Sequence, residues 1–182
     1  MKKGFTLIEL LIVIAILAIL ATVVVLVLNP AQLLAEARDG QRLSDMSSVS
    51  SAINLYLATN SNPTLTAGPF SEINAACGLG SGTCTVRTVY TVAGAGWVGV
   101  DLTGATGGSP LATLPRDPTG SATYQYAYAG DNTTKTFELN ARLESTKHRT
   151  KMTSDGGDDN TCTTYTETTC WFETGTKPGL NL

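Results

Sequence analysis

The sequence predicts an α+β fold in which one long N-terminal α-helix, half membrane-spanning and half amphipathic, packs on a small antiparallel β-sheet. Two observations lead to this prediction. Residues 4–28 form an apolar run, and apolar residues at helical spacing continue to about residue 58. Short alternating segments with Gly-, Ser- and Asn-rich turns follow, which is the pattern of short strands. The 182 residues suffice for one modest domain behind the apolar segment.

The N-terminal apolar segment is too long for a secretory signal peptide. Residues 10–28 are interrupted only by Thr22, whereas the apolar core of a signal peptide has about 7–15 residues. As a helix, residues 5–28 span about 36 Å, which covers a bilayer core of about 30 Å. Lys2 and Lys3 would hold the N-terminus in the cytoplasm. A plain anchor leaves Glu9 unexplained, because an acid at the centre of a membrane helix costs roughly 2.5–3.5 kcal/mol.

The stretch KKGFTLIEL, residues 2–10, resembles the class III-type prepilin signal of type IV pilins and type II secretion pseudopilins. The resemblance implies that residues 1–4 are a leader, cut off after Gly4 by prepilin peptidase, and that Phe5 is then N-methylated. It also implies an assembly role for Glu9, the fifth residue of the mature chain. Cleavage leaves a charged amine that a carboxylate can neutralise. Glu9 can meet the amine of its own chain one helical turn away, whereas the family implies the amine of a neighbouring subunit.

The helical pattern is expected to form one helix from about residue 5 to residue 58, with 29–58 as its amphipathic half. Its apolar stripe consists of Met46, Val49, Ile53, Tyr56 and Leu57. The polar residues Arg38, Asp39, Arg42 and Asp45 are assigned to the other faces of this helix. Pro30 removes a backbone donor, so a kink is expected there, and the resemblance matches Pro30 to a proline of pilins in this region.

Residues 59–182 are expected to form a pilin-like globular head. The segments 85–92, 96–102, 123–129 and 135–144 have the composition or alternation of strands, and residues 129–135 are typical of a hairpin turn. The tyrosine stripe 124, 126 and 128 is interpreted as core packing. A second stretch resembles the Pro-x-Asp-Pro motif of major pseudopilins and is assigned a structural role; its residues are Pro115, Asp117, Pro118, Gly120, Tyr124 and Tyr126.

The four cysteines lie in two close pairs, Cys77 with Cys84 and Cys162 with Cys170. In an exported domain these predict disulfides, with local pairing favoured among the three possible connectivities. The second pair is expected to close the C-terminal region of the head. Zinc is the competing interpretation, but neither spacing is C-x-x-C and His148 is the only histidine.

Two polar loops are candidates for binding. Residues 153–162 gather Asp155, Asp158 and Asp159 around two glycines, and hard oxygen ligands on such a loop suit Ca²⁺. The loop resembles the calcium-binding loop of major pseudopilins, and the competing interpretation is a solvated acidic turn. Residues 147–151 form the only basic cluster, too short to predict nucleic-acid binding in a chain of net charge −3.

Nothing in the sequence predicts an enzyme, because it lacks a G-x-S-x-G motif, a Gly-rich phosphate loop and a recognisable carboxylate pair. The resemblance implies a structural subunit of a type IV pilus or pseudopilus. Its partners are then copies of itself in a helical filament, prepilin peptidase, the assembly platform and ATPase, and membrane lipid before assembly. It starts as a single-pass protein of the bacterial inner membrane and ends outside the cytoplasm. The alternative is a monomeric, membrane-anchored extracytoplasmic binding domain with an uncleaved helix.

Overall fold

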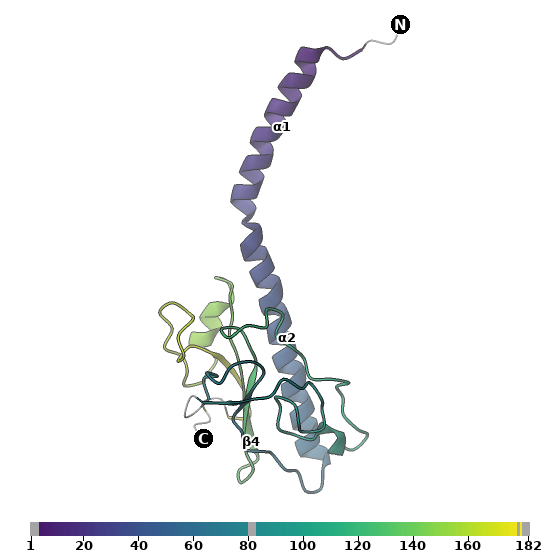
Figure 1. Cartoon of the computed structure of the whole chain (residues 1–182), viewed down its shortest axis with the longest axis vertical. Helices are drawn as coiled ribbons and strands as arrows, with labels where there is room; N and C mark the ends of the chain where they lie inside the picture. The colour runs from purple at the N-terminus through teal and green to yellow at the C-terminus, as the bar shows by residue number, and fades with distance from the viewer. Residues whose placement is uncertain (1–3, 80–82, 178, 180–182) are drawn as a thin grey trace.

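A long helical stalk rises from a globular head in this protein (Figure 1). The computed structural model describes residues 4–79, 83–177 and 179. Helix α1, Leu7–Leu28, projects away from the head, and helix α2, Pro30–Thr59, lies along it. The expected α+β architecture is therefore confirmed. Residues 1–3 of the leader lie outside the described residues, so the role of Lys2 and Lys3 stays a prediction.

The stalk consists of two helices, which corrects the expectation of one helix with a kink at Pro30. Asn29 has φ 40° and ψ 76°, in the left-handed region, and it caps both helices. Its side-chain Oδ1 accepts a hydrogen bond from Gln32 N at 3.4 Å. Pro30 is the first residue of α2, where no backbone donor is needed. Because a proline disfavours the helical conformation in the residue before it, the break falls at Asn29 rather than at Pro30.

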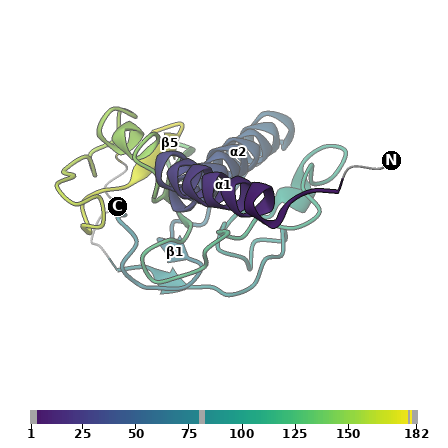
Figure 2. The same cartoon turned by 90° about the horizontal axis from the view of Figure 1, so that it is seen from above.

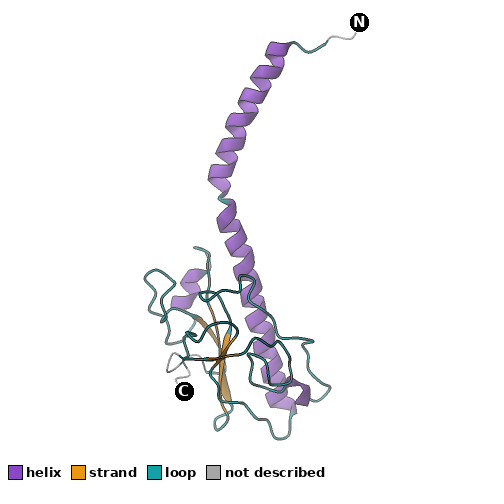
Figure 3. Cartoon of the chain, viewed as in Figure 1, coloured by secondary structure: helices purple, strands orange, loops and turns teal. Residues whose placement is uncertain are grey.

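The head contains a five-stranded sheet (Figure 3). Its strands are β1 Phe70–Ser71, β2 Thr85–Val86, β3 Ala127–Asp131, β4 Thr136–Ala141 and β5 Phe172–Gly175, in the order β2-β1-β3-β4-β5. All neighbours are antiparallel except β1 and β2. Two short 3₁₀ helices complete the described elements, η1 Leu102–Gly104 and η2 Arg149–Thr153.

The strand predictions held best for the central hairpin. Segment 135–144 contains β4, whereas segment 123–129 only overlaps β3, which begins at Ala127 and runs on to Asp131. The turn between the two strands falls within 129–135 as expected. Segment 85–92 forms only the short β2, and 96–102 forms turns, with one isolated bridge between Ala93 and Asp101. The prediction of a strand at 96–102 was wrong because this segment packs as an irregular loop. A Cβ added at Gly99 would lie 2.4 Å from the Phe70 ring, so the backbone itself lies against the core.

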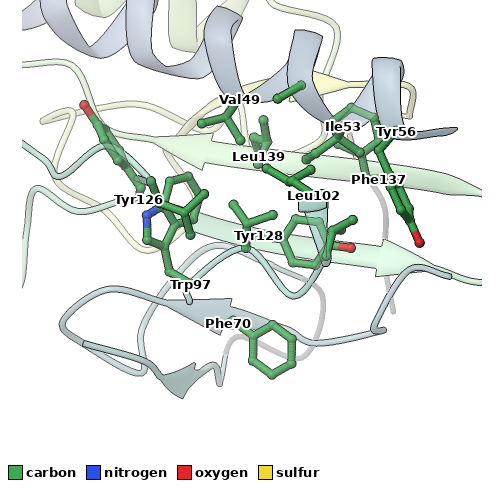
Figure 4. Close-up of a cluster of buried hydrophobic side chains, with 14 of the residues drawn as sticks. Val49, Ile53, Tyr56, Phe70, Trp97, Leu102, Tyr126, Tyr128, Phe137 and Leu139 are labelled. Carbon is green, nitrogen blue, oxygen red and sulfur yellow. The ribbon is translucent and has the colours of Figure 1, made fainter. Parts of the chain in front are cut away.

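The core of the head lies between α2 and the sheet (Figure 4). The predicted stripe of α2 is confirmed: Met46, Val49, Ile53 and Tyr56 are buried, and Leu57 is partly buried. The tyrosine stripe is core as well. The ring of Tyr126 lies 5.5 Å from that of Trp97, and the ring of Tyr128 stacks on that of Phe70 at 6.3 Å. Tyr124 lies before β3 and is only half-buried.

Candidate functional site

The N-terminus of α1 carries the residues that the prepilin resemblance singles out. Gly4 and Phe5 precede the helix, and Phe5 is 83% exposed. A Cβ added at Gly4 would meet no atom within 4 Å. The peptide bond after Gly4 is therefore part of an open, non-helical segment, which is the form in which a protease can bind a substrate strand.

Glu9 is held by a capping box. Its carboxylate Oε2 accepts hydrogen bonds from Thr6 N at 2.8 Å and from Thr6 Oγ1 at 2.6 Å. Thr6 is the N-cap of α1 and its Oγ1 accepts a bond from Glu9 N at 3.3 Å. Thr6 was not among the predicted site residues, although a Thr three residues before a Glu, just ahead of an apolar run, is the known signature of this cap.

The capping box gives Glu9 a local partner in the uncut chain. The carboxylate is turned back towards Thr6, the residue that follows Phe5. An acid in the first turn also suits the positive end of the helix dipole. Glu9 is therefore placed within one turn of the position where cleavage after Gly4 would create an amine.

Behind Glu9, the surface of α1 is apolar on all sides. The candidate membrane span Leu7–Val25 has a mean hydropathy of 3.1, and none of it is buried against the rest of the described chain. Ile8, Val13, Ile19 and Val25 are between 46% and 66% exposed. A helix that is apolar all round needs an apolar environment, and the head, which covers part of α2, does not provide it.

Where the stalk enters the head, α2 is fixed by a buried charge network around Arg42. Both Arg42 and Asp117 are buried, and the guanidinium holds the carboxylate through two bonds, Nε to Oδ2 at 2.7 Å and Nη2 to Oδ1 at 3.0 Å. Arg42 also donates to Asp39 Oδ1 at 2.9 Å and to Thr119 Oγ1 at 2.8 Å. The Arg42 Nη1 lies 2.6 Å from Glu144 Oε1. One side chain of α2 thus contacts two loops of the head.

The network continues through Asp39 and Glu144. Asp39 accepts hydrogen bonds from the backbone nitrogens of Glu144 and Ser145. Arg38 pairs with both carboxylate oxygens of Glu144, at 2.8 and 2.6 Å. Burial alone would raise the pKa of Glu144, but the hydrogen bonds from Arg38 and Arg42 lower it to about 2. The carboxylate is therefore held in its charged form by both arginines.

The assignment of Asp39 and Arg42 to faces of the helix other than the apolar stripe was wrong. Both are 0% exposed. Their positions follow the buried stripe in steps of three and four, which runs Ala35, Asp39, Arg42, Met46, Val49, Ile53 and Tyr56. The spacing contained the signal, but charged residues are rarely buried unless they are paired, and the partner Asp117 is 75 residues away.

The Pro-x-Asp-Pro stretch forms the turn that supplies this partner. Asp117 Oδ1 accepts hydrogen bonds from Thr119 N at 2.8 Å and Gly120 N at 3.0 Å, and Gly120 has φ 59°. Glu72 accepts a bond from Asp117 N and another from Tyr126 N. Burial raises the pKa of Glu72 to about 7. The stretch therefore links α2, the sheet and the loop before β3, in line with the structural role expected for it.

The cysteines are joined in the two local pairs that the sequence favours. Cys77 is bonded to Cys84 and Cys162 to Cys170, and the described residues contain no free cysteine. Cys170 directly precedes Trp171, and both are buried. The second disulfide thereby fastens the loop 161–169 beside the start of β5, the last strand of the head.

The acidic loop 153–162 is folded onto β5. Asp155 Oδ2 accepts a hydrogen bond from Glu173 N at 2.9 Å, and Asp159 N donates to Glu173 Oε2 at 2.9 Å. Burial and the charge of Asp158 raise the pKa of Asp159 to about 6. Burial and the neighbouring Glu138 raise the pKa of Glu173. Within the described ranges, no three His, Cys, Asp or Glu side chains form a group that could hold a metal ion. Calcium binding through Asp155, Asp158 and Asp159 stays a prediction.

Comparison with known proteins agrees with the N-terminal features. Residues 1–25 match the prokaryotic N-terminal methylation motif, the class III prepilin signal of type IV pilins and pseudopilins. No curated protein and no solved structure matches the chain. The motif covers Gly4, Phe5, Glu9 and most of α1, and the head lies outside the matched residues.

Proposed function

We propose that this chain is a structural subunit of a type IV pilus or pseudopilus, cut after Gly4 by prepilin peptidase and N-methylated at Phe5. The observation that carries the proposal is that α1, most of which lies within a methylation motif, is an apolar helix whose surface is not buried against the head. Its length suits a bilayer, and its bare surface suits the interior of a helical polymer equally well. The chain is then a substrate of an enzyme, rather than an enzyme itself.

Helix α1 would lie first in the bilayer and later in the interior of the filament. Before assembly, α1 lies in the inner membrane with its N-terminus in the cytoplasm and the head outside. The assembly platform and its ATPase then transfer the subunit into a filament, where the α1 helices of neighbouring copies replace the lipid. The break at Asn29 separates the segment that changes its environment from α2, which stays fixed to the head.

Glu9 has a partner at each stage of this scheme. In the uncut chain its carboxylate is satisfied by Thr6. After cleavage, Phe5 carries a positive amine, and a buried charge needs an opposite charge nearby. Glu9 neutralises that amine, either its own or that of the neighbouring subunit, and this is the role in assembly that we assign to it.

Variants at Glu9 in cells with the peptidase and assembly machinery test the proposal. Glu9→Gln retains an oxygen that can accept from Thr6 but removes the charge, whereas Glu9→Ala removes both. We expect both variants to be inserted and cut after Gly4, and neither to enter sheared filaments. Thr22→Val is the matched control within α1, because Thr22 Oγ1 bonds only to the helix carbonyl of Ala18.

One result would decide against the filament, and another against the role of Glu9 in its assembly. An intact Met1 on protein from these cells would favour the alternative, a monomeric membrane-anchored binding domain outside the cytoplasm. Normal filament yield from Glu9→Gln would show that assembly does not need the charge of Glu9, and would leave the proposed cleavage unaffected.

A further inference from the structure

A basic surface lies at the end of the head from which the stalk emerges. Its cations are Lys147, Arg149 and Lys151, from η2 and the residues just before it, and we call it the η2 surface. Figure 1 shows η2, in light green, at the α1 end of the head, whereas the β3–β4 turn lies at the opposite end. The view from above in Figure 2 shows η2 beside the helices, not covered by another element. The surface thus faces the side on which a bilayer around α1 would lie.

The ion pair between Lys147 and Glu36 shows how far along the stalk this surface lies. Lys147 Nζ lies 3.1 Å from Glu36 Oε2. Glu36 is eight residues beyond Leu28, the last residue of α1, which corresponds to about 12 Å along a helix. At physiological salt, charges act over about 8–10 Å. The surface is only slightly further than this from the end of α1, and its long lysine side chains can shorten the distance.

Arg149 and Lys151 carry the charge that is available to an external partner, and Lys147 stays largely exposed although it pairs with Glu36. The side chain of Lys147 is 64% exposed, and Lys151 is exposed. Arg149 is half-buried, with its guanidinium 4.5 Å from the centre of the Tyr165 ring. Among the described residues, neither Arg149 nor Lys151 forms an ion pair with an acidic side chain.

The nearby acids are engaged within the protein. Glu144 pairs with Arg38 and Arg42, and Asp39 pairs with Arg42. Asp155, which follows η2, accepts a hydrogen bond from the backbone of β5. Because Glu36 offsets Lys147, the positive charge of the surface comes from Arg149 and Lys151, in a chain whose net charge is −3.

We propose that the η2 surface binds the anionic phospholipid headgroups of the bilayer that holds α1. The inference rests on the proposed function in one respect, the insertion of α1. Each lysine or arginine close to an anionic membrane strengthens the contact about fivefold. The contact sets one side of the head against the membrane and is broken when the subunit leaves the bilayer. Nucleic acid fits less well, because the surface has no row of aromatic side chains for stacking bases.

Hydrogen exchange of the full chain in lipid nanodiscs tests this contact. Residues 145–153 provide the probe, since the amides of His148, Arg149 and Lys151 form turn hydrogen bonds there. We expect these amides to exchange at least about fivefold more slowly in discs that contain phosphatidylglycerol than in phosphatidylcholine discs. The difference should vanish at about 1 M salt, where the screening length is about 3 Å.

A pair of matched variants separates this surface from a general effect of charge. Lys147→Gln/Lys151→Gln should strongly reduce the lipid difference, because only Arg149 remains of the three cations. Lys135→Gln/Lys177→Gln removes the same charge near the opposite end of the head, where Lys135 lies in the β3–β4 turn and Lys177 N bonds to Phe137 O. This control should keep the lipid difference.

Three outcomes would overturn the inference. Equal exchange in both kinds of disc, with the chain incorporated, removes the lipid contact but leaves the proposed function intact. Failure of the chain to enter discs removes the anchor and the contact together. Equal slowing by duplex DNA added to phosphatidylcholine discs would show a general polyanion site rather than a lipid site.

Discussion

Replacement of Arg42 by methionine should destabilise the head more than any other loss of a single charge on α2. The substitution keeps an unbranched side chain but removes the guanidinium. The side chain that is lost is fully buried and contacts three carboxylates, those of Asp39, Asp117 and Glu144.

The loss in the free energy of unfolding depends on the hydrogen bonds that those carboxylates retain. Removal of one partner from a buried ion pair costs about 3–5 kcal/mol. Asp117 retains Thr119 N and Gly120 N, and Asp39 retains backbone donors from Glu144 and Ser145. We therefore expect the lower end of that range, about 3 kcal/mol. With a urea slope of about 2 kcal/mol per M, the midpoint should fall by about 1.5 M.

Urea unfolding of the full chain in detergent, followed by tryptophan fluorescence, measures this loss. Trp97 and Trp171 are both buried in the head, so their emission reports its unfolding. Arg38→Met is the control, since Arg38 lies one turn earlier and its side chain is 36% exposed in a pair with Glu144. Its cost should stay within about 1 kcal/mol. Equal midpoints for the two variants would refute the view that the buried network fixes α2 to the head.

Three further predictions concern other parts of the chain. Because burial raises the pKa of Glu72 from 4.5 to about 7, the folded state holds a proton that the unfolded state has released, so stability should fall as pH rises through this window. Glu72→Gln should flatten that part of the pH profile of unfolding midpoints, and an unchanged slope would contradict the assignment. Asn29→Ala/Pro30→Ala should join α1 and α2, seen as helical ¹³C shifts at residue 29; a retained break would show that the two residues are not its cause. Calcium binding by the acidic loop predicts a heat of titration that Asp158→Ala/Asp159→Ala removes, and no heat from the unaltered chain would end that prediction.

The features that the sequence predicted well depend on local periodicity. The apolar run of α1, the stripe from Met46 to Tyr56 and the hairpin of β3 and β4 all repeat over several turns or residue pairs. The strands β1 and β5 were missed, because two and four residues are too few to show an alternation. Segment 96–102 has strand composition, yet its buried residues Trp97, Val98 and Val100 are placed by contacts with the rest of the core.

The candidate sites likewise differ in whether their signal is local in the sequence. Gly4, Phe5 and Glu9 are readable because their order along the chain is itself the signal, and the Thr6 cap was visible in the same few residues. The Arg42 network was not readable, since its partners at 117 and 144 come close only after the head has folded. The position of the basic cluster 147–151 at the stalk end likewise depends on the fold and not on its own composition.

The mass of the N-terminal peptide from assembled filaments tests the central claim most directly. The protein should be isolated from cells that contain prepilin peptidase and digested, and its first peptide sequenced by tandem mass spectrometry. We expect a chain that begins at Phe5 and carries one added methyl group on its amine. A chain that still begins at Met1 would contradict it.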